Sequence, residues 1–135
     1  MIATSIAPML SVRRGASAVD FYAAAFGAVE RFRVENPAGE VVARLSVPYG
    51  HSEQGAEFWV SDESPAHGNF SPETLNGGTV RMILTVADPD AMFARAVTAG
   101  AQVVTPMADA YGWRLGRVVD PFGHHWEIGR PLGSR

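Results

Sequence analysis

The chain has 135 residues, of which 11 are lysine or arginine and 14 are aspartate or glutamate, so its formal net charge is −3. This charge offers little attraction for a polyanion and argues against a nucleic-acid partner. A hydrophobic share of 47% beside 19% charged residues predicts one packed domain over residues 1–135 and excludes disorder of the whole chain.

The chain contains no cysteine, which excludes disulfides, thiolate metal sites and thiol nucleophiles. No stretch approaches the roughly 18 apolar residues of a membrane-spanning helix. No basic segment precedes the first short apolar run, as a secretory signal peptide would require. We therefore expect a cytoplasmic protein that has neither a membrane nor a nucleic acid among its partners.

The first half of the sequence predicts a strand, a helix and three more strands. The short apolar run at residues 6–12 has the composition of a strand. A capping-box-like pattern at residues 17–20 predicts the start of a helix of about ten residues, whose apolar side chains recur at helical spacing and which Gly27 ends. The further strands are predicted over residues 29–35, 41–47 and 56–61.

The second half repeats this order after a polar segment. Residues 63–78 are rich in Ser, Pro, Gly and Asn, with only Phe70 and Leu75 as large apolar side chains, which predicts a linker or covering loop. A strand at 79–87 then precedes a helix for which Asp88 is the expected N-cap. The remaining strands are predicted over residues 101–105, 113–119 and 124–129.

The two halves align with each other. Leu10-Ser-Val12 matches Leu84-Thr-Val86, and Phe26-Gly-Ala28 matches Ala99-Gly-Ala101. We infer an α+β fold of two tandem βαβββ modules, at about residues 1–62 and 79–131, joined by the loop 63–78. Two small sheets, each with a helix on one face and with their uncovered faces inward, would form a curved cup.

Four segments carry a resemblance to a known family. They are Pro8-Met-Leu-Ser-Val12, Asp20-Phe-Tyr22 with Ala25-Phe-Gly27, Tyr111-Gly-Trp-Arg-Leu-Gly-Arg117, and Asp120-Pro-Phe-Gly-His-His-Trp126. Over nearly its whole length the chain resembles the vicinal oxygen chelate (glyoxalase/bleomycin resistance protein/dioxygenase) superfamily, and it is most similar to the PhnB-like branch. The resemblance implies the glyoxalase/bleomycin resistance fold and a homodimer in which modules of two chains complete two cups. It implies no single reaction, because the superfamily includes lyases, isomerases, dioxygenases, transferases and drug-sequestering proteins.

Metal-dependent members of this family hold a divalent cation with four residues, one from the first and one from the last strand of each module. Strand alternation maps these positions onto Met9, Trp59, Ile83 and Glu127. Only Glu127 offers a ligand for a hard or borderline cation. A displaced site that recruits Glu57 and His125 would need ligands about 6.6 Å away along their strands. We therefore expect no metal and no other cofactor, and keep the displaced divalent cation as an alternative.

The inward positions of the cup predict a small-molecule site with apolar and aromatic walls and few polar groups. The residues expected to bind ligand are Met9, Ser11, Glu57, Trp59, Ile83, Thr85, Trp113, His125 and Glu127. Trp59 is suited to stack on a planar ligand. An inward Glu127 needs a donor, for which His125, Ser11 or Thr85 are the candidates.

Two classes of function remain open on this sequence. The first is metal-independent binding of a small, mostly apolar or aromatic molecule, as in bleomycin-resistance-like sequestering proteins. The alternative is a lyase, isomerase or dioxygenase that uses a displaced divalent metal, or His125 and Glu127 as a general acid/base pair. Tyr111, Arg114 and Arg117 are expected near the mouth of the last hairpin. His51 and His67 lie in polar loops and are expected to be exposed.

Overall fold

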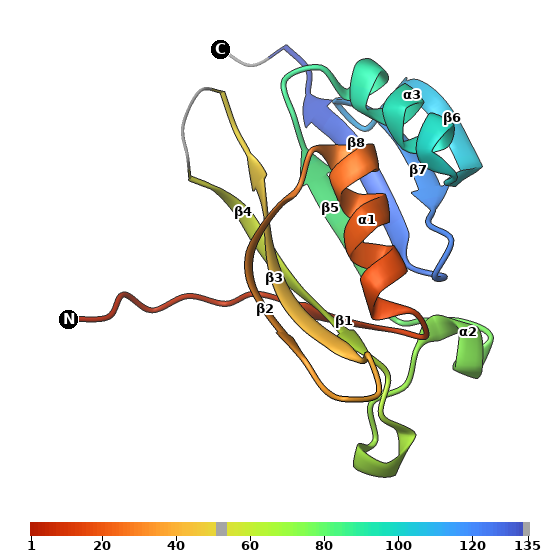
Figure 1. The fold of residues 1–135 in the computed structure, drawn as a ribbon. Coiled ribbons are helices and arrows are strands. Elements are labelled where there is room, and N and C mark those ends of the chain that lie inside the picture. The colour runs from red at the N-terminus through yellow and green to blue at the C-terminus, as the bar shows by residue number, and fades with distance from the viewer. Residues whose placement is uncertain (51–53, 134–135) are drawn as a thin grey trace.

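The computed structural model describes residues 1–50 and 54–133 and contains two four-stranded sheets (Figure 1). The first sheet has the order β1-β4-β3-β2, with β1 (Met9–Val12), β2 (Val29–Glu35), β3 (Val41–Pro48) and β4 (Gly55–Asp62). The second has the order β5-β8-β7-β6, with β5 (Arg81–Thr85), β6 (Gln102–Ala110), β7 (Trp113–Val119) and β8 (His125–Pro131). The helices are α1 (Gly15–Phe26), α2 (Pro72–Leu75) and α3 (Pro89–Ala99), with a 3₁₀ turn, η1 (Pro65–His67).

The two sheets have the same internal connectivity. In each, the first strand pairs in parallel with the last, and the other neighbours are antiparallel. A helix follows the first strand of each sheet. The predicted α+β fold of two tandem βαβββ modules is therefore confirmed. None of the helices in the described part of the chain has the length and hydropathy needed to cross a membrane.

Helix α1 begins differently from the prediction. The capping box at residues 17–20 is wrong, because the helix already starts at Gly15, whose N–H donates to Asp62 Oδ1 at 3.0 Å. The other carboxylate oxygen of Asp62 accepts from the Val41 N–H at 2.6 Å. A residue at the end of β4 thus satisfies the first turn of the helix, and a Cβ at position 15 would collide with it. The predicted stop is confirmed, since Gly27 adopts the left-handed conformation with φ of 69°.

Helix α3 begins as predicted, because the Asp88 side chain accepts from the Ala91 N–H at 3.2 Å. The strand that follows it is longer than predicted. β6 continues past Thr105 to Ala110 because it pairs with the whole of β7, through two irregularities in register. Its Pro106 is tolerated since β6 is an edge strand of its sheet.

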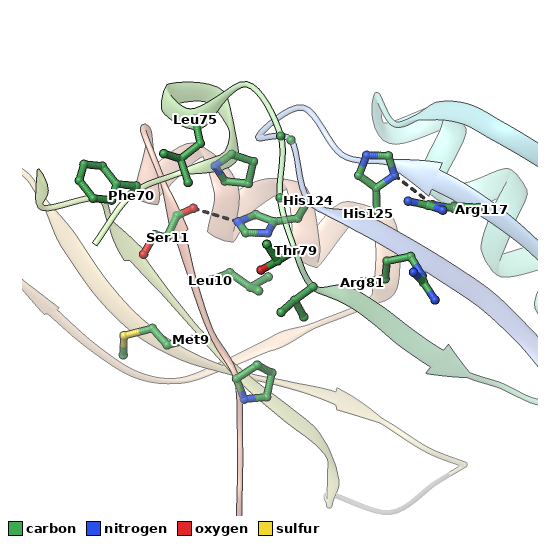
Figure 2. A pocket seen from close by; sticks show the side chains of 16 residues that line it. Met9, Leu10, Ser11, Phe70, Leu75, Thr79, Arg81, Arg117, His124 and His125 are labelled. Atoms are coloured by element: carbon green, nitrogen blue, oxygen red, sulfur yellow. Dashed lines mark hydrogen bonds between the residues drawn. The ribbon is translucent and has the colours of Figure 1, made fainter. Parts of the chain in front are cut away.

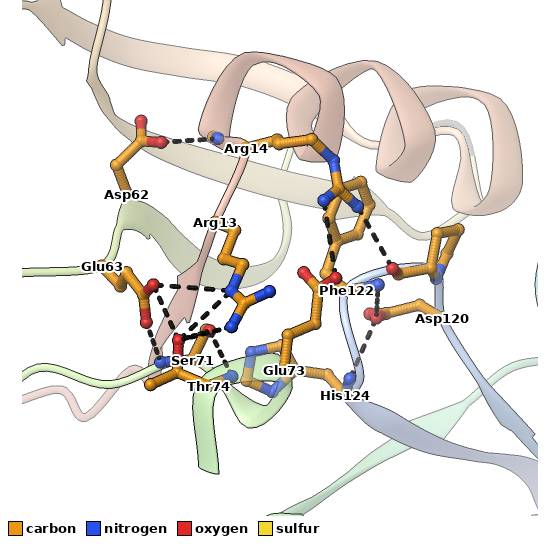
Figure 3. A network of polar contacts seen from close by, with 12 residues as sticks. Arg13, Arg14, Asp62, Glu63, Ser71, Glu73, Thr74, Asp120, Phe122 and His124 are labelled. Atoms are coloured by element: carbon orange, nitrogen blue, oxygen red, sulfur yellow. Dashed lines mark hydrogen bonds and ion pairs between the residues drawn. The ribbon is translucent and has the colours of Figure 1, made fainter. Parts of the chain in front are cut away.

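The segment 63–78 is held against the end of β1 (Figure 3). Glu63 accepts from the Ser71 N–H and from Thr74 Oγ1, both at 2.8 Å. These hydrogen bonds, the first above all, lower the pKa of the Glu63 carboxyl group. Arg13 Nε donates to Thr74 Oγ1 at 3.2 Å and lies 3.7 Å from Glu63. The predicted covering loop is therefore an anchored element that contains η1 and α2.

The two modules share one core, because α1 packs against α3 as well as against its own sheet. Aromatic rings cross the boundary between the modules: Trp126 of β8 lies 4.6 Å from Phe26 and 5.5 Å from Tyr22, centroid to centroid. Phe58 of β4 lies 5.4 Å from the same indole. Such contacts contribute beyond the burial of their area, so each sheet stabilises the other through α1.

A buried carboxylate lies beneath this aromatic cluster. Asp120, only 4% exposed, accepts hydrogen bonds from Tyr22 Oη and from Trp126 Nε1, the latter at 2.9 Å. Its second oxygen accepts from the backbone N–H groups of Phe122 at 2.9 Å and His124 at 3.0 Å. Burial and the nearby Asp120 charge raise the pKa of Tyr22. One side chain therefore connects α1 of the first module to the β7–β8 turn of the second.

The variant Asp120→Asn tests this connection. An amide replaces one accepting oxygen with a donor that faces donors already in place, so we expect the free energy of unfolding to fall by about 2–4 kcal/mol. Tyr22→Phe, which removes one donor and keeps the ring, should cost about 1–2 kcal/mol. Urea unfolding followed by circular dichroism measures both variants. A loss below about 0.5 kcal/mol in Asp120→Asn would show that the carboxylate does not hold the modules together.

Candidate functional site

The strand alternation expected for the cup is visible in the burial of the strands. Leu10, Phe58, Leu84 and Trp126 are buried against the helices, and the residues between them lie on the outer faces of the sheets. The four positions that the family uses for metal fall into two register pairs, Met9 opposite Trp59 and Ile83 opposite Glu127. Met9 is 53% and Ile83 is 62% exposed. Within one chain, the outer faces of both sheets are thus open at these positions.

The outer face of the first sheet carries an aromatic patch around Trp59. Its indole meets the Phe32 ring edge to face, at 5.9 Å between centroids, and the Arg44 guanidinium lies 5.8 Å from the same ring. Arg44 also forms an ion pair with Glu57 at 3.8 Å. Phe32 and Arg44 were not predicted as site residues. Both stand in the same register row as Trp59, so extending the alternation across the hairpin would have found them.

The outer face of the second sheet carries two arginine pairs. Glu127 forms its ion pair with Arg81 of the neighbouring strand β5, so the donors predicted for it, His125, Ser11 and Thr85, were wrong. His125 instead accepts at Nδ1 from Arg117 Nε at 3.0 Å. The two members of the expected acid/base pair thus each contact an arginine. Glu127 also lines a small pocket of about 180 Å³ on this face, together with Ile83, Trp113, Leu115 and Gly129.

A larger cavity of about 700 Å³ lies between β1 and β5, the edge strands of the two sheets (Figure 2). We call it the β1–β5 cavity. Its lining comes from the start of β1, from residues 70–81 and from the β7–β8 hairpin, and includes Met9, Leu10, Ser11, Phe70, Leu75, Thr79, Arg81, Arg117, His124 and His125. Three residues of the predicted site therefore border it: Met9, Ser11 and His125.

The other predicted site residues lie away from this cavity. Trp59 and Glu57 lie on the outer face of the first sheet, and Ile83, Trp113 and Glu127 line the small pocket. Thr85 borders a different hollow of about 830 Å³ beside the start of α3, together with Val47, Met92 and others. The structure thus distributes the predicted residues over both outer faces and gathers only part of them in one place.

Several lining residues were not predicted as site residues. Phe70 and Leu75 were recognised only as the large apolar side chains of the linker, and their exposure, 43% and 60%, is the signal that they could line a site. Arg81 stands two residues before Ile83 on the same face, so alternation could have found it. His124 reaches the cavity because its Nε2 lies 2.9 Å from the Ser11 carbonyl oxygen, a contact between the modules that the sequence does not indicate.

The residues that the family uses for a divalent metal do not fit that role in this chain. Of the four positions only Glu127 is an oxygen donor, and it contacts Arg81. Within residues 1–50 and 54–133, no group of three or more His, Asp or Glu side chains lies close enough together to hold a metal ion. Glu57, which the displaced site would need, lies on the other sheet from His125 and Glu127.

The remaining candidates lie at the surface. Arg114 pairs with Asp90 at 2.8 Å and Asp109 at 3.3 Å, so it supports α3 and the hairpin. Tyr111 is 98% exposed. His67 is exposed, as expected, and its Nδ1 lies 2.7 Å from Ser64 Oγ. His51 lies outside the described residues.

Comparison with known proteins decides the family. The model of the Glyoxalase/Bleomycin resistance protein/Dioxygenase superfamily matches residues 5–128. The chain belongs to this superfamily. An uncharacterized protein of Mycobacterium bovis is 42% identical to this superfamily member over 133 residues, which cover 95% of the chain and 84% of the relative.

Two solved structures show how this superfamily's fold recurs. TioX from Micromonospora sp. ML1 is 28% identical, with a TM-score of 0.69, and the match covers 96% of this chain and all of that one. TnmS3 from Streptomyces sp. CB03234, an antibiotic binding protein, is 21% identical with a TM-score of 0.64, covering 97% of this chain and 99% of its own. The second likeness shows the fold alone.

The contact between His125 and Arg117 predicts a measurable titration. Partial burial and the adjacent Arg117 cation lower the pKa of His125 below its ordinary value of 6.5. The neutral imidazole is therefore favoured on folding, and its contribution to stability is present above pH 6.5 and is lost as the pH falls through the folded-state pKa. Arg117→Gln should move the pKa of His125 up toward 6.5. NMR titration of the imidazole signals, with His125→Gln for assignment, measures this, and an unchanged pKa in Arg117→Gln would contradict the contact.

Proposed function

We propose that this protein binds a small, mostly apolar or aromatic molecule without a metal, in the β1–β5 cavity and the outer faces beside it. The observation that carries the proposal is the cavity itself, in which residues of both outer faces meet. Its volume of about 700 Å³ lies within the range of roughly 300–1,000 Å³ typical of small-molecule sites. Met9, Phe70 and Leu75 supply an apolar wall.

The residues at the four positions that the family uses for metal favour binding of an organic ligand over metal chemistry. Three of the four positions carry Met9, Trp59 and Ile83, which offer apolar and aromatic surface to a ligand. The fourth, Glu127, is engaged by Arg81. Of the nine residues predicted to bind ligand, Met9, Ser11 and His125 line the cavity, where Phe70, Leu75, Arg81 and Arg117 join them. The other six remain proposed contacts on the outer faces: Glu57, Trp59, Ile83, Thr85, Trp113 and Glu127.

The comparisons are compatible with a sequestering role. TnmS3 is an antibiotic binding protein, so the fold can bind a drug-sized molecule. By analogy we propose a role of the bleomycin-resistance type, in which binding removes a harmful molecule from solution without reaction. Membership of the PhnB-like branch and a cytoplasmic location remain predictions of the sequence.

We further propose that the protein acts as a homodimer. Phe32, Met9 and Ile83 leave 45%, 53% and 62% of their surface exposed on the outer faces of one chain, and a second copy facing them would bury this apolar surface and close a cup over the ligand. Light scattering should then give about twice the chain mass of 14.4 kDa. A mass of one chain would contradict the dimer.

A neutral fluorescent probe tests the proposed binding. N-phenyl-1-naphthylamine brightens on entering an apolar site, and we expect saturable binding that a chelator such as EDTA does not change. Phe70→Ala removes an aromatic wall of the cavity and should weaken binding about tenfold, whereas Trp59→Ala reports whether the ligand extends over the first sheet.

Arg33→Gln is the matched control. Arg33 lies on β2, where it pairs with Glu30 and Glu35. This strand is at the edge of the sheet opposite β1, and Arg33 is not part of the cavity lining. The control should bind the probe like the parent protein. Equal affinity in the parent, Phe70→Ala and Trp59→Ala would contradict our placement of the site. Loss of binding in EDTA, restored by a divalent metal, would contradict metal independence.

A further inference from the structure

The β1–β5 cavity has walls of two different kinds (Figure 2). Met9 and Phe70 lie on one side of it, and Arg81, Arg117 and His125 lie on the other. The first wall is apolar and the second carries guanidinium groups. A ligand that is apolar throughout would satisfy only one of them.

The titratable groups of this lining are all basic. They are Arg81, Arg117, His124 and His125, and the described residues that line the cavity include no Asp or Glu. Glu127 forms an ion pair with Arg81, and it lines the small pocket rather than this cavity. The cavity therefore presents positive charge to its contents.

Glu127 balances only one of the two arginines. It stands opposite both Ile83 and Arg117 in the strand register, yet its ion pair is with Arg81. Arg117 turns to His125, donating from Nε to Nδ1 at 3.0 Å. A ring nitrogen that accepts a hydrogen bond carries no proton, so a neutral imidazole is the partner of Arg117. Two arginines, one carboxylate and one neutral imidazole therefore share a net charge of one positive unit, which lies on Arg117.

A half-buried guanidinium with a neutral partner is costly unless an anion reaches it. Its Nε is occupied by His125, which leaves its terminal nitrogens to form charge-assisted hydrogen bonds with two oxygens of an anion. Carboxylate and sulfonate groups have this geometry.

We propose that the ligand of the β1–β5 cavity is an amphipathic organic anion, whose apolar or aromatic body lies against Met9 and Phe70 and whose acidic group binds Arg117 beside Arg81. This inference rests on the proposed function, because it names the class of molecule that the same cavity selects. A cationic drug would be repelled by the two guanidinium groups of this wall and would bind less tightly.

Two probes that differ by a single sulfonate group test the inference. 8-Anilinonaphthalene-1-sulfonate is an organic anion, and N-phenyl-1-naphthylamine is the same body without the sulfonate. We expect the anion to bind at least about tenfold more tightly than the neutral probe. Added salt should weaken the binding of the anion only. Arg117→Gln should lower the affinity for the anion about tenfold more than it lowers the affinity for the neutral probe. Arg33→Gln, which removes an equal charge outside the cavity, should change neither.

Each result has one meaning. Tighter binding of the anion that depends on Arg117 supports the inference. Binding of both probes with equal affinity, or anion binding that Arg117→Gln does not weaken, overturns it and leaves the proposed binding function standing. Binding of neither probe by the folded protein, as judged by circular dichroism, overturns both. Equal losses of anion affinity in Arg117→Gln and Arg33→Gln would show attraction by net charge alone and would also overturn it.

Discussion

The buried carboxylate of Asp120 is the interaction on which the arrangement of this protein depends. It accepts from Tyr22 on α1 and from Trp126 on β8, and so ties the helix of the first module to the last strand of the second. It also accepts from the backbone of His124, which fixes the chain where β8 begins. Because His124 and the next residue, His125, both line the β1–β5 cavity, the carboxylate that joins the modules also positions one wall of this cavity.

The opposite wall depends on a second polar network (Figure 3). Glu63 and Arg13 hold α2 against the end of β1, so that Phe70 and Leu75 lie over the cavity. Arg14 extends this network toward the β7–β8 turn, since it donates to the Pro121 carbonyl oxygen at 3.4 Å and lies 5.1 Å from the centre of the Phe122 ring. The segment that connects the modules is thus part of the site, and its polar composition provides the contacts that hold it in place.

The fold and the register of the four positions that the family uses for metal could be read from the sequence because both follow from local periodicity. Alternation with a period of two places Met9 with Trp59 and Ile83 with Glu127, and the internal repeat carries the first pair onto the second; the strand registers agree. The helix stop at Gly27 and the N-cap at Asp88 are also local signals. The start of α1 was missed because its capping group, Asp62, lies 47 residues away in the sequence. The partners of Glu127 and His125 were missed for a different reason: each is an arginine of a neighbouring strand, and cross-strand side-chain pairing depends on rotamers that the pattern does not specify.

We propose that a small molecule occupies the cavity between β1 and β5. A crystal structure of the protein grown with N-phenyl-1-naphthylamine tests it most directly, since it locates the probe without assuming any residue's role. We expect the ring system against Met9 and Phe70, with the four positions that the family uses for metal free of any ion. A probe bound only elsewhere, with the cavity filled by side chains of this chain or of a second copy, would contradict it.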